Sequence, residues 1–235
     1  MVSKMKYNFI IAHKPFDKKP FTYMANKEFI SDNATEGTTN VTNMPDSRIY
    51  GEMTFWLYIY NKLKENDDWA ALHHYRRKFE YVYQQICVAK PMAFNCSLYD
   101  QLAMYHSPRV ADAMEKALGN PILRQTNLFF PYNIMNLPKE VLGHWIQFCS
   151  SIVDNTLGIL NLRDKNFEEI KEFVSNDSTF TGPNPQNPSK NLDPIYQTRI
   201  GAYILERANS LFWLTQFPGN FIPCEISLLE KGQKI

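Results

Sequence analysis

Residues 69–80, WAALHHYRRKFE, place cationic and ring-bearing side chains directly after an apolar run. The apolar part is typical of a buried strand. It is followed without a break by His73, His74, Tyr75, Arg76 and Arg77. Arginine presents a rigid fork of donors that matches phosphate oxygens, and histidine can also donate to phosphate. Because such groups are costly to bury without partners, the segment predicts a strand that delivers cations to an anionic ligand.

The same residue types allow other interpretations. The arginine pair could form structural ion pairs with Glu52 or Glu80. A zinc site at His73 and His74 is disfavoured, because neighbouring strand residues point to opposite faces and no third ligand has a useful spacing. A serine hydrolase is disfavoured because the sequence has no GxSxG.

Strand alternation makes a finer prediction about this cluster. If the strand continues through the arginines, His74 and Arg76 share one face and Arg77 points to the other. We then expect His74 and Arg76 to contact the ligand first, and Arg77 to form a structural ion pair.

Two further predicted strands also end on cations. Residues 6–13, KYNFIIAH, end on His13 and Lys14, and ICVA at residues 86–89 is followed by Lys90. Strands that alternate with helices favour an α/β fold with a mostly parallel sheet, in which ligands bind beyond the carboxyl ends of the strands. No GxxxxGK[ST] or GxGxxG occurs. Side chains would therefore hold the anion, and their combination suits a diphosphate better than a lone carboxylate.

Capping signals predict the helices between these strands. Asp46 or Ser47 can begin a helix that continues to about residue 63, and Ser97 can cap LYDQLAMYH. Ser107, with a proline after it, begins another helix that stops at Gly119. A long helix is predicted from about residue 138 and an amphipathic one from about 195. Residues 31–47 are predicted as a long loop, and the proline-rich residues 175–194 as a mobile loop or lid.

Composition limits the function classes. The chain has 235 residues, of which 44% are hydrophobic, and a net charge of +1, so it should fold around a core and has no overall attraction to nucleic acid or anionic membrane. The apolar run near the start is too short for a signal peptide or a membrane span. The four cysteines contain no CxxC pair, which favours reduced thiols in a cytoplasmic protein.

Several short motifs together resemble a family of small capsular and exopolysaccharide-biosynthesis glycosyltransferases. They occur in the family's order along nearly the whole chain: AHKP at 12–15, SDN at 31–33, GEMTFW at 51–56, HYRRKF at 74–79, LYDQ at 98–101, FPYNIM at 130–135, YQTR at 196–199 and LER at 205–207. The family pattern has HYRRYF and ELT where this chain has HYRRKF and EMT. The resemblance implies a GT-A-like single domain, with residues 1–95 binding a nucleotide sugar and residues 96–235 on the acceptor side.

The resemblance also assigns expected roles. His13, Lys14, Asp32 and Asn33 would bind the nucleotide base and ribose of the donor, a UDP-sugar being the expected type. The remaining donor-binding residues would be Glu52, His74, Arg76, Arg77 and Lys90, with Glu52 orienting one arginine. The acceptor side would comprise Tyr132, Asn133, Tyr196, Gln197 and Arg199. The base for an inverting transfer would be Asp193 or Glu206, although Glu206 could instead be a structural partner of Arg199 or Arg207.

Metal use and acceptor identity stay open at this stage. Many GT-A enzymes hold a divalent metal with a D-x-D motif, and none stands at a predicted strand end here. We therefore expect His74, Arg76 and Arg77 to supply some of the charge neutralisation that a metal would give. The acceptor would be a saccharide. One alternative is a modified DNA base that receives a pentose or hexose, which the near-zero net charge does not favour. Another is a non-catalytic module that binds a sugar nucleotide or a glycan.

Overall fold

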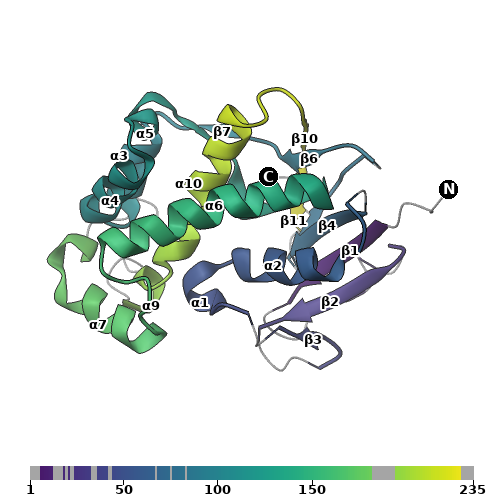
Figure 1. Ribbon diagram of the computed structural model, residues 1–235, viewed down its shortest axis with the longest axis horizontal. Helices are drawn as coiled ribbons and strands as arrows, with labels where there is room; N and C mark the ends of the chain where they lie inside the picture. Colours follow the sequence, from purple (N-terminus) through teal and green to yellow (C-terminus); the bar gives the residue numbers. More distant parts are fainter. Residues whose placement is uncertain are drawn as a thin grey trace.

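A mostly parallel sheet flanked by helices forms the centre of the protein, as predicted (Figure 1). The computed structural model describes residues 6–12, 18, 21, 24–32, 36–41, 44–66, 68–74, 76–82, 84–181 and 194–228. The main path of the sheet runs in the order β10-β6-β9-β4-β1-β2-β3. Its strands are β1 (Lys6–Ile11), β2 (Lys27–Ser31), β3 (Thr39–Asn40), β4 (Trp69–His74), β6 (Cys87–Ala89), β9 (Met135–Pro138) and β10 (Ile222–Cys224).

Strand directions bring the expected strand ends to one edge. β1 pairs in parallel with both β2 and β4, and β6 pairs in parallel with β10. β9 lies between β4 and β6 and runs antiparallel to both, so β6 has the same direction as β4. The carboxyl ends of β1, β2, β4, β6 and β10 therefore lie along one edge, together with the residues that precede β9. This carboxyl edge is where ligands bind in such sheets.

The chain reverses at the end of β4 instead of continuing as one strand. β5 (Arg77–Phe79) runs antiparallel to β4, with His74 opposite Arg77, and also pairs with β11 (Ile226–Leu228). The alternation expected through Arg76 and Arg77 is therefore wrong, because it required an unbroken strand. A small second sheet joins β7 (Met92–Ala93) to β8 (Leu128–Phe129).

The helices form largely as their capping signals predict. The Ser97 side chain accepts from the Asp100 backbone N–H, and Ser107 and Gly119 bound the next helix. The helices are α1 (Ser47–Tyr50), α2 (Met53–Lys62), α3 (Leu98–Tyr105), α4 (Pro108–Leu118), α5 (Ile122–Gln125), α6 (Lys139–Ile159), α7 (Phe167–Asn176), α9 (Pro194–Gln197) and α10 (Ile200–Thr215), with 3-10 turns η2 (Pro131–Asn133) and η3 (Ser178–Thr181).

Two predicted helices are broken, and the strands β2 and β3 were not predicted. The helix expected from residue 47 to 63 is split at Gly51, which has a left-handed φ of 57°. The final helix is split between α9 and α10. Within the expected loop at 31–47, α1 begins at Ser47 and the short strand β3 forms. β2 was missed because its first residues are polar and only its last two are buried. Residues 182–193, which form most of the predicted loop at 175–194, lie outside the described residues.

Close packing fixes α1 against α10. A Cβ added to Gly201 would lie 2.8 Å from the backbone O of Ile49, and one added to Gly51 would lie 2.7 Å from Cβ of Ala202. Both distances are too short for a larger residue without movement. The contact brings Glu52, which follows Gly51, opposite the first turns of α10.

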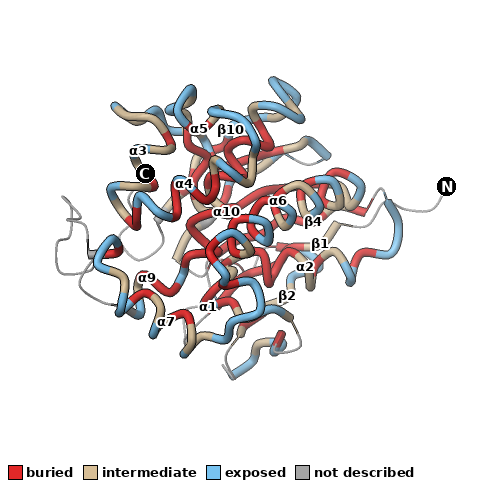
Figure 2. The backbone as a smooth tube through the Cα atoms, turned by 60° about the vertical axis from the view of Figure 1, so that its left-hand side comes forward, coloured by how far each residue is buried: buried red, intermediate tan, exposed pale blue. Residues whose placement is uncertain are grey.

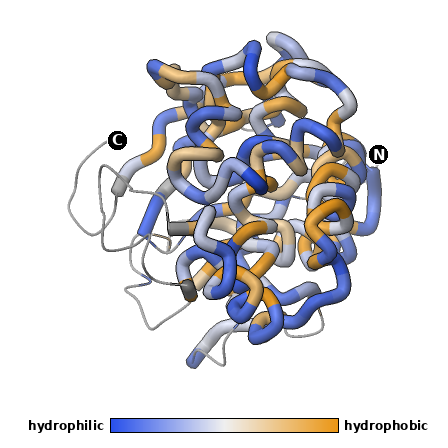
Figure 3. The backbone as a smooth tube through the Cα atoms, turned by 90° about the vertical axis from the view of Figure 1, so that its left-hand side faces the viewer, coloured by the Kyte–Doolittle hydropathy of each residue, from blue (hydrophilic) through white to orange (hydrophobic). Residues whose placement is uncertain are grey.

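The core lies between the sheet and the long helices α6 and α10. α10 is buried along most of its length (Figure 2), and hydrophobic and hydrophilic segments alternate along the surrounding helices (Figure 3). All four cysteines are free thiols. In the part of the chain that the structure describes, none of the helices has the length and apolar character needed to cross a membrane.

Candidate active site at the carboxyl edge of the sheet

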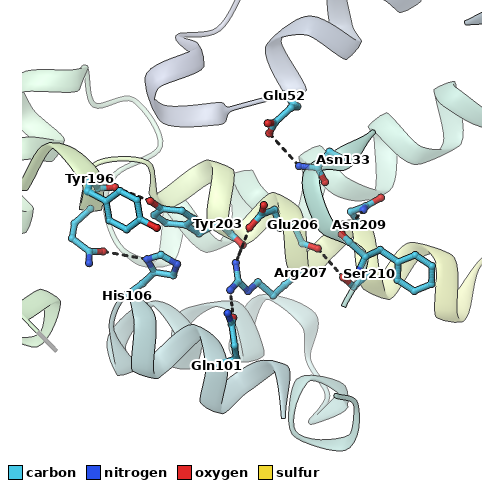
Figure 4. Close-up of polar contacts among 12 residues, drawn as sticks. Glu52, Gln101, His106, Asn133, Tyr196, Tyr203, Glu206, Arg207, Asn209 and Ser210 are labelled. Carbon is cyan, nitrogen blue, oxygen red and sulfur yellow. Dashed lines mark hydrogen bonds and ion pairs between the residues drawn. The ribbon is translucent and has the colours of Figure 1, made fainter. Parts of the chain in front are cut away.

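Glu206 is the central carboxylate of a charged cluster at this edge. It projects from α10, and its side chain is 24% exposed (Figure 4). Burial raises the pKa of the Glu206 carboxyl above its usual 4.5, and the nearby Glu52 adds to this rise. The cations that oppose the rise are Arg207, Arg199 and Arg77. The raised pKa makes the ionised Glu206 carboxylate a stronger proton acceptor than an exposed glutamate.

Arg207 holds the Glu206 side chain in place. Its Nη1 lies 3.2 Å from Oε2 of Glu206 and donates to the backbone O of Tyr203 at 3.0 Å. Its Nη2 donates to Oε1 of Gln101 on α3 (Figure 4). Burial lowers the pKa of Arg207, which is only 2% exposed, while Glu206 opposes that shift. This ion pair agrees with the alternative prediction that Glu206 is a structural partner of Arg207. The Glu206 side chain nevertheless stays partly accessible.

A strained turn before β9 adds two more site residues. Tyr132 and Asn133 both have left-handed backbones, with φ of 69° and 47°. The turn is fixed by Trp56, whose Nε1 donates to the backbone O of Asn133 at 2.9 Å. The Asn133 side chain donates to Oε2 of Glu52 at 3.3 Å. Non-glycine residues keep such conformations only where the surroundings enforce them, and they concentrate at functional sites.

Arg77 joins this turn to the charged cluster. Its guanidinium lies over the ring of Tyr132, 4.1 Å from the ring centre. Among the described residues, three buried atoms of the cluster lack a hydrogen-bond partner: Nε of Arg77, Oδ1 of Asn133 and Nε of Arg207. Buried polar atoms are nearly always satisfied, so several unsatisfied ones in one place indicate a site that binds a polar ligand.

A second buried group supports the start of α10. The His106 ring stacks on Tyr203 with centroids 3.5 Å apart, and its Nδ1 lies 3.2 Å from Oε1 of Gln197. Gln197 also donates to the backbone O of Tyr105, and the Tyr203 hydroxyl donates to the backbone O of Tyr196. Gln197 is 1% exposed and fully engaged in these contacts, so it supports the fold around the site. Tyr196 is half-buried beside Tyr203.

His106 gives the protein a pH-dependent stability. Burial lowers the pKa of His106 well below 6.5, so the unfolded chain takes up more protons than the folded one below that pH. We expect the free energy of unfolding to fall as pH drops below about 6.5, by up to about 1.4 kcal/mol per pH unit from this residue. Urea unfolding at pH 7.5 and at pH 5.5 would measure this difference in the free energy of unfolding. His106→Phe should reduce the difference, whereas His144→Asn at an exposed position should not; an equal pH dependence in both variants would contradict the assignment.

The other predicted donor residues fall into separate places along the edge. Asp32, after β2, accepts from the Ser47 hydroxyl and lines a cavity of about 350 Å³ together with Asp46 and Arg48. Lys90, after β6, forms an ion pair with Glu225 at 2.6 Å. His74 is buried and its Nδ1 accepts from the Arg76 backbone N–H at 3.2 Å.

The structure thus brings together Glu52, Arg77, Tyr132, Asn133, Arg199 and Glu206. Arg199 is exposed at the start of α10. His13, Lys14, Asn33 and Asp193 lie outside the described residues. Sequence reasoning did not give a role to Gln101 or Tyr203. The sequence offered one indication of a role for Gln101, which is that it belongs to the LYDQ motif of the resemblance.

Metal ligands do not assemble among the residues that the structure describes. No group of three or more His, Cys, Asp or Glu side chains there is arranged to hold an ion. Around Glu206 the charged groups are instead arginines and Glu52.

The fold is similar to that of a solved glycosyltransferase. One similar solved structure is the apo form of the WbbM bifunctional glycosyltransferase, with a TM-score of 0.59 and 12% sequence identity. The alignment covers 98% of this chain and 46% of that one, so this chain spans about half the length of its neighbour. No family model matches the sequence, and no curated protein is significantly similar to it. The two chains share their fold, and the polysaccharide-biosynthesis family suggested by the motifs stays a prediction.

Proposed function

We propose that the protein is a glycosyltransferase that moves a sugar from a nucleotide-sugar donor, of the UDP type, to a saccharide acceptor. The observation that carries this proposal is Glu206, a carboxylate with a raised pKa, beside Arg77 at the carboxyl edge of the sheet. The glycosyltransferase-like fold supports it, because such sheets bind ligands at this edge. The unsatisfied polar atoms of Arg77 and Asn133 support a polar ligand at the same place.

The chemistry assigned to these residues is a single displacement. An acceptor hydroxyl attacks the anomeric carbon, a new C–O bond forms, and the bond to the diphosphate breaks with its electron pair leaving on the nucleotide diphosphate. Glu206 takes the hydroxyl proton, and Asp193 is the alternative base. Arg77 and Arg199 neutralise the charge that develops on the leaving diphosphate. The cavity beside Asp32 would hold the ribose and base. His13, Lys14 and Asn33 are proposed for the same role from the sequence and lie outside the described residues.

Binding and turnover of donors test the proposal directly. We expect one nucleotide family in a panel of UDP-, GDP-, CMP- and dTDP-sugars to raise the thermal midpoint. At a concentration of about 100 times Kd, the gain of about 2.7 kcal/mol corresponds to roughly 5–10 °C for a chain of this size. Slow hydrolysis of the same donor should accompany binding. If no sugar nucleotide shifts the midpoint, the proposal is wrong; binding without any turnover would indicate a non-catalytic module.

A further inference from the structure

A small cavity adjoins the charged cluster on the side away from Asp32. Its volume is about 200 Å³, and it lies where β6 and β10 end beside the η2 turn. Pro91, Met92, Pro131 and Ile226 form its apolar lining, and Tyr132 lines it as well. We call it the Tyr132 cavity. Pockets for drug-sized ligands have volumes of about 300–1,000 Å³, so this one suits a single small ring.

Tyr132 connects the cavity to the site. Its ring lines the cavity and also carries the Arg77 guanidinium, while the next residue, Asn133, binds Glu52. A ligand in the cavity would therefore be separated by the Tyr132 ring from Arg77, to which stabilisation of the leaving diphosphate is assigned.

The turn that carries Tyr132 is anchored to α10 through the preceding residue, Phe130. The Phe130 backbone N–H donates to Oγ of Ser210 at 2.9 Å, and Nδ2 of Asn209 donates to the backbone O of Phe130 at 3.1 Å. Two successive non-glycine residues with left-handed backbones carry a conformational cost. The protein keeps this strained turn against its cost, and its effect is to aim Tyr132 and Asn133 toward the cavity and Glu52.

The charge at the cavity favours a neutral ligand. Its charged lining residues, Lys90 and Glu225, pair with each other at 2.6 Å, so their charges cancel. Both keep donor and acceptor capacity for hydroxyl groups, and their side chains are 62% and 42% exposed. An apolar wall with an aromatic ring and a few polar groups at its rim suits the carbon face and hydroxyls of a sugar ring.

We propose that the Tyr132 cavity is the acceptor subsite, and that it binds one uncharged sugar ring whose hydroxyl receives the transferred sugar. The remainder of a longer acceptor would extend into solvent, since the cavity has room for one ring. This inference rests on the proposed function. It adds Met92, Pro91 and the Lys90–Glu225 pair to the acceptor side, and it moves Lys90 from the donor side, where we had expected it, to the rim of the acceptor subsite.

Saturation-transfer NMR with methyl glycosides of galactose, glucose, mannose and N-acetylglucosamine tests the subsite. Protein saturated with the nucleoside diphosphate of the preferred donor should bind at least one of them, and uronic acid analogues at least tenfold more weakly. Met92→Trp, which fills the cavity, should remove the signal. Met104→Trp is the matched control, because Met104 on α3 is similarly exposed, at 41% against 38%, and lies outside the cavity.

The outcomes separate this inference from the proposed function. Met92→Trp should keep the thermal shift with the donor nucleotide, which also shows that it folds, and Met92→Arg gives a second filled cavity. Loss of glycoside binding with retained nucleotide binding supports the subsite. Undiminished glycoside binding in both filled variants, or no binding of any glycoside to the wild type, would overturn it. Absence of nucleotide binding in the wild type would instead count against the proposed function.

Discussion

Replacing Glu206 by glutamine is expected to lower turnover of the sugar nucleotide by about 10²–10⁴-fold, the usual contribution of a positioned general base. Donor affinity should change little, because the proton is taken from the acceptor and not from the donor. Glutamine keeps the shape of the side chain and can still accept from Nη1 of Arg207, which lies 3.2 Å from the carboxylate. The change thus removes the proton acceptor with little disturbance of its surroundings.

The pH dependence provides the sharper test of this base. A base acts only when ionised, so activity should fall as pH drops through the pKa of Glu206. Burial raises that pKa above 4.5, which places the loss of activity at a higher pH than for an exposed glutamate. Glu206→Asp should keep an acidic limb, at a different midpoint, and Glu206→Gln should lose the limb that belongs to this residue.

Glu140→Gln is a suitable control, since Glu140 is an exposed acidic residue in the first turn of α6. Its turnover and pH profile should match the wild type. If Glu206→Gln instead loses thermal stability while the surviving folded fraction turns over donor at the wild-type rate, Glu206 is only the structural partner of Arg207. In that case Asp193 becomes the candidate base.

Gln101 has a positioning role at Glu206, because it contacts the arginine that pairs with this carboxylate. It contacts Arg207 and not Glu206, so it can affect the base only through the guanidinium. This chain of contacts joins α3 to α10, two elements about a hundred residues apart in sequence. Sequence periodicity identifies each helix but cannot show that their polar side chains meet.

The parts of the fold that depend on local chemistry were predictable from the sequence. Ser107, Pro108 and Gly119 each satisfy a requirement of a helix end, and the structure uses all of them. The parallel strands and their shared carboxyl edge followed from the alternation of apolar runs with helices. The same alternation predicted that the cations following these strands lie at that edge, and the strand directions agree with it.

The parts that depend on long-range contacts were not predictable. The reversal between His74 and Arg77 carries no glycine, proline or asparagine that would signal a turn. It is stabilised by β11, which pairs with β5 from the far end of the chain. The left-handed Tyr132 and Asn133 are likewise enforced by Trp56 and by α10. Arg77, and not Arg76, consequently lies over Tyr132.

Replacing Arg77 by alanine is the second change with a large expected effect. If Arg77 stabilises the departing diphosphate, its loss should lower turnover by about 10²–10³-fold, similar to the loss of one oxyanion-stabilising donor in other enzymes. Lysine should restore only part of the activity, because it keeps the charge but not the planar fork that binds two phosphate oxygens and stacks on Tyr132.

Arg124 offers a matched control for the stacking itself. Its guanidinium lies over the ring of Tyr99, 3.4 Å from the ring centre, and it pairs with Glu115 at the surface. Arg124→Ala removes a similar cation–ring contact at the surface, and Arg124→Lys changes it in the same way as Arg77→Lys does. Both should leave turnover within about twofold of the wild type, so that any large loss in the Arg77 variants reflects the ligand and not the ring contact.

The metal dependence of turnover tests whether arginines replace the divalent metal that many GT-A enzymes use to neutralise the leaving diphosphate. We expect a chelator to leave wild-type turnover unchanged, since Arg77 and Arg199 lie near Glu206 and can supply the charge that a metal would give. Activity that disappears with chelator and returns only with Mn²⁺ or Mg²⁺ would contradict this, and so would rescue of Arg77→Ala by either ion. An arginine that the fold holds in place supplies positive charge without a metal ion having to bind. Departure of the diphosphate would then depend on the position of Arg77 over Tyr132.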